Sequence, residues 1–220
     1  SKAISAYEQS LYLAKQIKVI PLPLTYNNLA IIHNLQGDFN KAYHNCLEGL
    51  ELVNKINNNF DKININLTLT ETYRGLKNLY KVQECMSILE DLLNKNPNPI
   101  LDALFLRQKS RISLDEEQFE SARDSIFKAI NIRKLNDGDP AFLEYKLELA
   151  KICYYAKEYD KSIINLDSVE AGIKNEKHFY HLANVYLYKT LSYFYLNNLV
   201  DFEKYKELTL ELIKEKNYLY

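Results

Sequence analysis

One stretch near the start of the chain, residues 26–54, constrains the fold more than any other. It contains two amphipathic patterns with the 3.6-residue spacing of an α-helix, separated by Gly37-Asp38. Glycine adopts the positive φ angles of a sharp turn at little cost. The small residues Ala30 and Ala42 would let two helix axes approach closely. The stretch therefore predicts an antiparallel pair of helices joined by a short turn.

The order and spacing of these residues resemble the tetratricopeptide repeat (TPR). That pattern has an aromatic residue, a Leu-small pair and a second aromatic residue, then Gly-Asp-aromatic at the turn, and afterwards small and aromatic residues at fixed intervals. The matching residues are Tyr26, Leu29-Ala30, His33, Gly37-Asp38-Phe39, Ala42, Cys46 and Gly49. His33 and Cys46 stand where the family usually has aromatic residues. The resemblance implies an all-α fold, a right-handed α-solenoid superhelix of antiparallel helix pairs that binds proteins or peptides and needs no cofactor.

Fixed-period self-similarity extends the pattern along the chain. Small residues early in each expected second helix recur at Ala42, Cys85, Ala122 and Ser162, at unequal intervals close to forty positions. In the second hairpin Tyr73 stands where a small residue is expected. We expect one domain over residues 1–220 with four to five repeats. Residues 1–20 would be the second helix of a truncated repeat, which indicates that the chain begins inside a longer protein; hairpins would follow at 24–56, 63–95, 100–135, 141–171 and 176–216.

Composition narrows the class of protein. The 220 residues carry a formal net charge of −1, which gives no general attraction to nucleic acid or to anionic lipid. No run of 18 uncharged apolar residues occurs, so we expect no membrane partner. The three cysteines, Cys46, Cys85 and Cys153, lie far apart on expected helices. This pattern favours buried free thiols in a reducing, cytoplasmic compartment.

Motifs of catalysis and metal binding are missing from the sequence. It has no Gly-rich phosphate loop, no G-x-S-x-G and no HExxH, so we expect no catalytic residues and no enzyme. His178 and His181 have the i, i+3 spacing that can hold a metal. No other Cys, Asp or Glu cluster is placed to complete such a site, and packing is the favoured interpretation. We expect neither a metal nor a cofactor. Asp139-Pro140 predicts a helix start.

In TPR proteins the first helix of each hairpin lines a concave groove, and the resemblance implies the same here. The face beside the packing stripe also includes Thr70 and Tyr186, and it gives these candidate ligand-binding residues: Asn27, Ile31, Asn34, Arg74, Lys77, Arg107, Arg111, Lys151, Tyr154, Lys189 and Tyr193. Six of them are basic, which would suit an extended acidic peptide or a C-terminal carboxylate. Alternatively, they are the Lys and Arg residues common on any exposed helix face. Asn27 and Ile31 replace the Lys and Asn pair with which co-chaperone TPR domains grip chaperone tails, so that role is disfavoured.

Tyrosines concentrate in the last two expected hairpins, where they either fill space between helices or form an aromatic platform for a partner. Long, degenerate repeats are similar to those of bacterial peptide receptors and sensor kinases. We therefore expect a non-enzymatic module that binds a protein or short peptide, as the regulatory or sensor part of a larger signalling or transcription-control protein. A constitutive scaffold for a folded partner, or a homodimerisation module, is the alternative.

Overall fold

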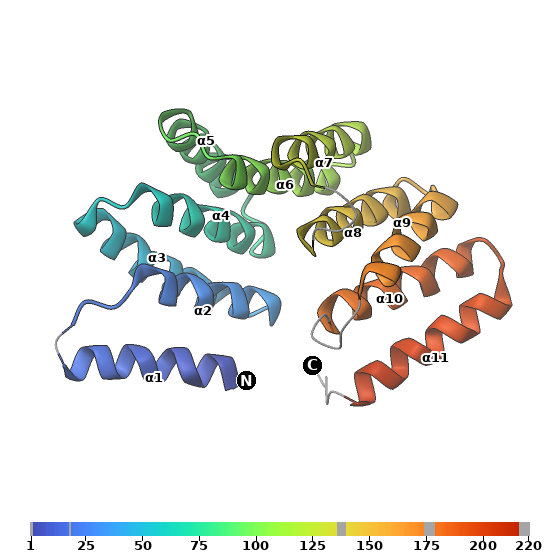
Figure 1. Ribbon diagram of the computed structural model, residues 1–220, viewed down its shortest axis with the longest axis horizontal. Helices are drawn as coiled ribbons and strands as arrows, with labels where there is room; N and C mark the ends of the chain where they lie inside the picture. The colour runs from blue at the N-terminus through green and yellow to red at the C-terminus, as the bar shows by residue number, and fades with distance from the viewer. Residues whose placement is uncertain (1, 18, 136–139, 174–178, 216–220) are drawn as a thin grey trace. The chain divides into compact units, whose positions relative to one another are not determined.

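The computed structural model describes residues 2–17, 19–135, 140–173 and 179–215, and every regular element in these ranges is a helix (Figure 1). The helices are α1 (Lys2–Gln16), α2 (Pro23–Leu35), α3 (Phe39–Ile56), α4 (Asn59–Gly75), α5 (Leu79–Lys95), α6 (Pro99–Asp115), α7 (Phe119–Arg133), α8 (Pro140–Tyr155), α9 (Tyr159–Gly172), α10 (Phe179–Tyr195) and α11 (Leu199–Glu215). The chain divides into two compact units, Ser1–Gln108 (unit 1) and Lys109–Tyr220 (unit 2), with the division inside α6. The single domain expected from the sequence stays a prediction.

Three-residue turns join the two helices of each hairpin, and they recur with a strict period. The second residue of every turn has a positive φ between 55° and 74°, and these residues are evenly spaced along the chain, at Gly37, Lys77, Glu117, Lys157 and Asn197. Helices α3, α5, α7, α9 and α11 therefore begin at equivalent positions, from Phe39 to Leu199. The unequal intervals expected around Cys85 are wrong, because the residue equivalent to Ala42 in the second hairpin is the buried Val82.

Backbone hydrogen bonds explain why the turn is so uniform. At the first turn the N–H of Gly37 donates to the carbonyl of Asn34 at 3.1 Å, and the N–H of Asp38 donates to the carbonyl of His33 at 2.9 Å. This is the Schellman arrangement, which needs one residue in the left-handed conformation and satisfies the last carbonyls of the helix. The same two bonds recur at the other four turns, so each helix end is closed by the residues that start the next helix.

The second helices also begin with side-chain caps at several turns. The Asp38 carboxylate accepts from the N–H of Lys41, and Asn78 and Asn198 accept in the same way from the N–H groups three residues on. Such a cap satisfies one of the free N–H groups at a helix start. The same short segment therefore ends one helix and starts another, which fixes the antiparallel pairing within each hairpin.

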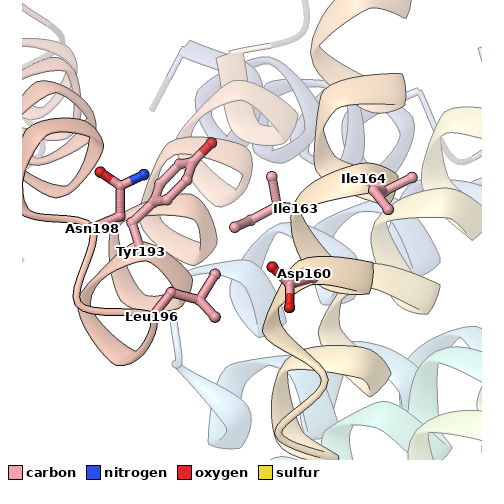
Figure 2. A pocket seen from close by; sticks show the side chains of 6 residues that line it. All are labelled: Asp160, Ile163, Ile164, Tyr193, Leu196 and Asn198. Atoms are coloured by element: carbon pink, nitrogen blue, oxygen red, sulfur yellow. The ribbon is translucent and has the colours of Figure 1, made fainter.

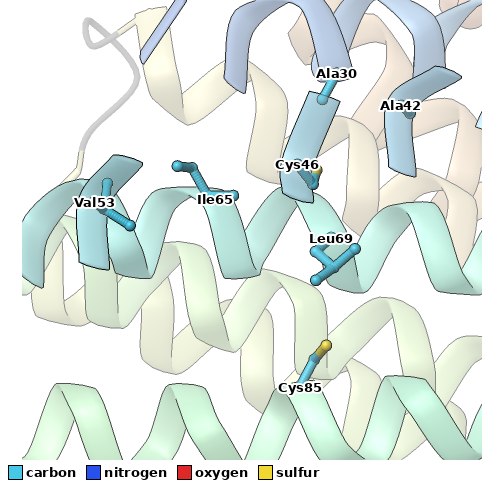
Figure 3. Packing of buried hydrophobic residues seen from close by; sticks show 7 residues of the cluster. All are labelled: Ala30, Ala42, Cys46, Val53, Ile65, Leu69 and Cys85. Carbon is cyan, nitrogen blue, oxygen red and sulfur yellow. The ribbon is translucent and has the colours of Figure 1, made fainter. Parts of the chain in front are cut away.

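Unit 1 has a core of small and branched side chains between α2, α3, α4 and α5 (Figure 3). Ala30 and Ala42 are fully buried where α2 crosses α3, as their size predicts. The buried cluster consists of Ala30, Ala42, Cys46, Val53, Ile65, Leu69 and Cys85. Thr70, equivalent to Ala30, is the small residue that packs in the second hairpin; it is fully buried and does not face a groove. The expectation that Tyr73 stands at the small-residue position is therefore wrong.

Unit 2 repeats this arrangement with Leu143, Leu147, Ala150, Leu166, Val169 and Val185 in its core. Close approach of the helices lets serine hydroxyls reach the backbone of the partner helix. Ser110 Oγ donates to the carbonyl of Ala122 at 2.9 Å, and Ser162 Oγ donates to the carbonyl of Ala150 at 2.9 Å. The two bonds join equivalent positions in successive hairpins, but Ser110 lies on the first helix of its hairpin and Ser162 on the second helix of the next. A serine on either helix is therefore sufficient to form the bond.

Helix α4 begins at Asn59, whereas the sequence pattern predicts that this hairpin begins at residue 63. The reason is a cap, because the Asn58 side chain accepts from the N–H of Asp61 and starts the helix earlier. Pro140 begins α8, as the sequence predicts, whereas Asp139 lies outside the described residues. So do residues 176–178 and 216 of the last expected hairpin.

Replacing Gly37 by Ala tests how much the left-handed residue constrains the fold. A Cβ atom at Gly37 would meet no heavy atom within 4 Å, so only the backbone conformation opposes it. We expect Gly37→Ala to lower the free energy of unfolding by about 1 kcal/mol, the cost of a left-handed non-glycine residue. Gly37→Asn should cost less, because Asn tolerates this conformation. Urea titration measures both variants, and equal free energies for Ala, Asn and wild type would contradict the expectation.

The three cysteines should be unreactive in the folded chain. All are buried, and burial raises the pKa of the thiol to about 12 for Cys46 and to about 11 for Cys85, and raises that of Cys153. The nucleophilic thiolate is therefore scarce at about pH 8. We expect iodoacetamide to modify the native chain at least about 100-fold more slowly than the chain in guanidinium chloride. The exposed control Asn40→Cys should react rapidly when native, and equally rapid labelling of Cys46 would contradict this view.

Candidate peptide-binding surface on the first helices

The constant spacing of the turns shows which predicted residues share one face of the first helices. Asn27, Ile31 and Asn34 on α2 define three positions of this face. Counting from turn to turn brings five further predicted residues onto the same positions, namely Arg74, Arg107, Arg111, Lys151 and Tyr154. The remaining three, Lys77, Lys189 and Tyr193, fall elsewhere. We call the shared positions the first-helix face, and describe it separately in each unit.

Lys77, Lys189 and Tyr193 are corrections to the expected site. Lys77 is the exposed left-handed residue of the second turn, with φ 55°, and lies beyond the end of α4. Lys189 and Tyr193 are equivalent to Leu29 and His33, which are both buried. Tyr186, which the sequence pattern also predicts on this face, is equivalent to Tyr26 and so lies at none of the three face positions. The error arises because α10 has aromatic or apolar residues around its whole circumference, so its sequence does not reveal which side packs.

Lys189 has a structural role that the sequence concealed. Its side chain is 1% exposed and forms ion pairs with Asp167, at 2.5 Å, and with Glu170. Its ammonium also donates to the Tyr205 hydroxyl at 3.0 Å. Burial lowers the pKa of Lys189, but the hydrogen bonds to these three partners raise it by more, so the pKa lies above its usual value. Lys189 therefore stays charged and ties α10 to α9 and α11.

In unit 1 the polar side chains of the first-helix face are largely engaged within the chain. Asn34 Nδ2 donates to the Thr72 hydroxyl at 3.0 Å and lies 3.3 Å from the Thr68 carbonyl, which joins α2 to α4. Arg74 forms an ion pair with Glu71 at 2.7 Å. Asn27 is buried, and its Oδ1 has no hydrogen-bond partner among the described residues. Ile31 is exposed, so the accessible part of this face includes an apolar side chain.

In unit 2 the basic residues of the face are also matched by partners. Arg111 Nε donates to Glu148 Oε1 at 2.9 Å, and Nη2 forms a second bond to the same oxygen. Glu148 is buried, so this ion pair between α6 and α8 neutralises a charge that would otherwise be costly. Lys151 Nζ lies 5.7 Å from the centre of the Tyr188 ring. Arg107, at the end of unit 1, is half-buried. The first-helix face is thus less positive than the sequence predicts.

Five tyrosines form a connected group beside Lys151, which we call the aromatic cluster: Tyr154, Tyr155, Tyr159, Tyr188 and Tyr195. The Tyr159 and Tyr195 rings are stacked, with centroids 4.9 Å apart, and Tyr154 contacts all four other rings. Burial raises the pKa of Tyr154 and Tyr188, so these two act mainly as packing residues. Tyr155 and Tyr195 are 51% and 52% exposed. The cluster thus contains both packed and half-exposed tyrosines.

Tyr155 and Tyr195 are absent from the expected site, although their signal is present in the sequence. Each is the last residue of a first helix, α8 or α10, so comparison at the correct period aligns them.

Among the described residues no group of three or more His, Cys, Asp or Glu could hold a metal ion. His181 belongs to this part of the chain, whereas His178 lies outside it. No described helix is both long and apolar enough to cross a membrane.

Comparisons with known proteins identify the fold. No family model matches the sequence, and no curated protein matches it. Solved structures do match. NprR in complex with its cognate peptide NprX has a TM-score of 0.76 at 17% identity, over 98% of this chain and 65% of that one. BtubC (BKLC) from P. vanneervenii has a TM-score of 0.67 at 14% identity, over 100% of this chain and 92% of that one.

A third match is the signal-transduction ATPase with a tetratricopeptide repeat sensor, PH0952 from Pyrococcus horikoshii. Its TM-score is 0.66 at 18% identity, over 96% of this chain and 34% of that one. This chain thus spans about a third of that protein and somewhat under two thirds of NprR. At such identities the likeness concerns the fold, and it agrees with the hairpins, the turns and the packed small residues. The chain has the tetratricopeptide-repeat fold, an all-α solenoid of antiparallel helix pairs.

Proposed function

We propose that this chain is a non-enzymatic module that binds an extended peptide or a protein segment, as the regulatory or sensor part of a larger signalling protein. The aromatic cluster on unit 2 is the observation that carries the proposal. Half-exposed tyrosines held in place by other rings offer contact area at a low entropic cost, which is typical of the residues that dominate binding energy. Lys151 beside the cluster supplies one positive charge for a peptide carboxylate.

Two of the similar structures support this proposal by their descriptions. NprR was solved with a cognate peptide, and the PH0952 repeats are described as a sensor within a larger ATPase. This chain matches only part of each, which suits a module whose output lies in another domain. Binding at the cluster would regulate that domain if the ligand prefers one arrangement of the helices over another. We propose no catalytic role for the first-helix face.

The preference for an acidic peptide is the weakest part of the sequence-based hypothesis. Arg74 and Arg111 are paired with Glu71 and Glu148, and Lys189 is buried with its own carboxylates. A ligand would have to displace these partners to use the charges. We therefore place recognition on the aromatic cluster, with Asn27, Ile31, Asn34, Arg107 and Lys151 as further candidate contacts on the first-helix faces of their own units.

A second candidate function has its own observation. On α2 in unit 1, Leu24, Ile31 and Leu35 are 39%, 40% and 58% exposed, and their spacing puts them on one side of the helix. Clustered apolar side chains at a surface mark protein interfaces. A constitutive scaffold for a folded partner, or a homodimer, would use this strip. Light scattering over a range of concentrations distinguishes the homodimer from the peptide-binding module.

Removal of the exposed tyrosines tests the peptide-binding proposal. A displayed library of random peptides is first selected on the full chain, and the Kd of a selected peptide is measured by titration calorimetry. We expect Tyr155→Ala combined with Tyr195→Ala to weaken binding by at least about 10-fold, as for interface aromatic residues. Tyr80→Ala is the control, because Tyr80 is exposed on α5 outside the cluster. A selected peptide that binds both variants equally, or no selectable peptide, would overturn the proposal.

A further inference from the structure

A pocket of about 460 Å³ lies in unit 2 between α9 and the turn from α10 to α11. Figure 2 shows Ile163 and Asp160 on α9 facing Tyr193 and Leu196 on α10 and the turn that follows it. Ile164 is 66% exposed and Leu196 36% exposed, so the pocket opens to solvent. Asn198 is held at the rim by its bonds to Asp201. The lining residues are Asp160, Ile163, Ile164, Tyr193, Leu196 and Asn198.

The equivalent space is filled at other junctions between hairpins. In unit 1 the Tyr43 ring, equivalent to Ile163, packs against Tyr73, equivalent to Tyr193, with centroids 5.7 Å apart. Between the preceding hairpins of unit 2, Arg123 takes the place of Ile163. Its Nη2 lies 2.7 Å from Glu158 Oε2, across the space that corresponds to the pocket. The pocket therefore exists because Ile163 is shorter than the side chains that fill this space elsewhere.

The filled junction also shows which chemistry suits the space. The interaction with Glu158 is the main reason why the pKa of Arg123 is raised, and the charge of Glu120 contributes. In the next hairpin the residue equivalent to Glu158 is the neutral Asn198 and the residue equivalent to Glu120 is Asp160, and both line the pocket. Asp160 forms no ion pair within the described part of the chain. The open junction thus has one acidic residue, Asp160, and no guanidinium, while an amide stands where the filled junction has Glu158.

Other charges around the pocket are mostly negative. Burial raises the pKa of the Tyr193 hydroxyl, and the charges of Asp201 and Asp167 raise it further. Lys189 acts in the opposite direction, but it is already paired with Asp167 and Glu170. Apolar walls from the isoleucine and leucine side chains of the lining would contact methylene groups. A cationic head on an aliphatic stem matches this combination of acidic rim and apolar wall.

We propose that this pocket binds the side chain of an arginine from a partner peptide, which occupies the space that Arg123 fills within the chain at the preceding junction. The aliphatic stem would pack on Ile163 and Leu196, and the guanidinium would pair with Asp160 beside the Tyr193 ring. The pocket borders the aromatic cluster, because Tyr159 and Tyr195 directly precede Asp160 and Leu196, but its lining shares no residue with the cluster. It therefore stands whether or not the first-helix face binds a peptide.

Isoleucine methyl signals in an NMR spectrum of the full chain test the proposal directly. The probe is N-acetyl-arginine amide, and its control is N-acetyl-citrulline amide, which has nearly the same shape but no charge. We expect the arginine probe to shift the Cδ1 signals of Ile163 and Ile164 with a Kd on the order of 1 mM, as for a ligand of this size. The citrulline probe should bind at least about fivefold more weakly.

Two variants and a control locate the site. Asp160→Asn should weaken the arginine probe by at least about fivefold, whereas Glu120→Gln, the equivalent change at the filled junction, should leave its affinity unchanged. Ile163→Arg should abolish the shift of Ile164 by filling the pocket from within. Unmoved isoleucine signals, equal binding of both probes, or an unchanged affinity of Asp160→Asn would overturn the proposal. So would signals of Ile163 and Ile164 that change on dilution without any probe, since they would assign the pocket to a second copy of the chain.

Discussion

The single left-handed residue in each turn is the constraint on which the hairpins depend. It directs the chain back after the first helix, and it brings two N–H groups onto the free carbonyls of that helix. The next residue starts the second helix, so the turn has no extra residues that would let the two helices pair in a different register. The five turns share the same two hydrogen bonds although only one of them contains glycine at the left-handed position. Backbone geometry, and not a particular side chain, is what the repeat preserves.

Around these turns, side chains vary in ways that leave the packing intact. A small residue is required where the helices of a hairpin cross, and alanine, threonine or serine all serve. Where serine is used, its hydroxyl finds a carbonyl on the partner helix, so its burial leaves no unpaired group. At the junctions between hairpins, Tyr43, Arg123 and Ile163 take one position with different chemistry. Each junction can therefore become a distinct surface without a change of fold.

Much of the fold could be predicted from the sequence, and the reasons for the errors are physical. The first hairpin combines a turn glycine, small crossing residues and an Asp cap, and these residues form the turn between α2 and α3. The left-handed residues of the other four turns look like ordinary polar residues, because this conformation costs a non-glycine residue only about 1 kcal/mol and local patterns do not reveal it. Without these markers the periodicity of α10 cannot be oriented, so the predicted site includes Lys189, which lies on the packing side. The Arg111 and Glu148 pair joins residues 37 apart, so its charge balance emerges only from the packing.

The strict interval between turns has a consequence for how such a chain can change in length. Helices α5 and α7 contain 17 and 15 residues, yet the next turn follows each at the same interval. The reason is that more residues separate α7 from α8 than separate α5 from α6. Gain or loss of a whole block of codons equal to one period would add or remove one hairpin and leave every remaining turn in register. A single inserted residue within a helix would instead rotate all later side chains of that helix by about 100°. Duplication of entire blocks is therefore the simplest genetic route by which a sequence of this kind lengthens while its hairpins still fold.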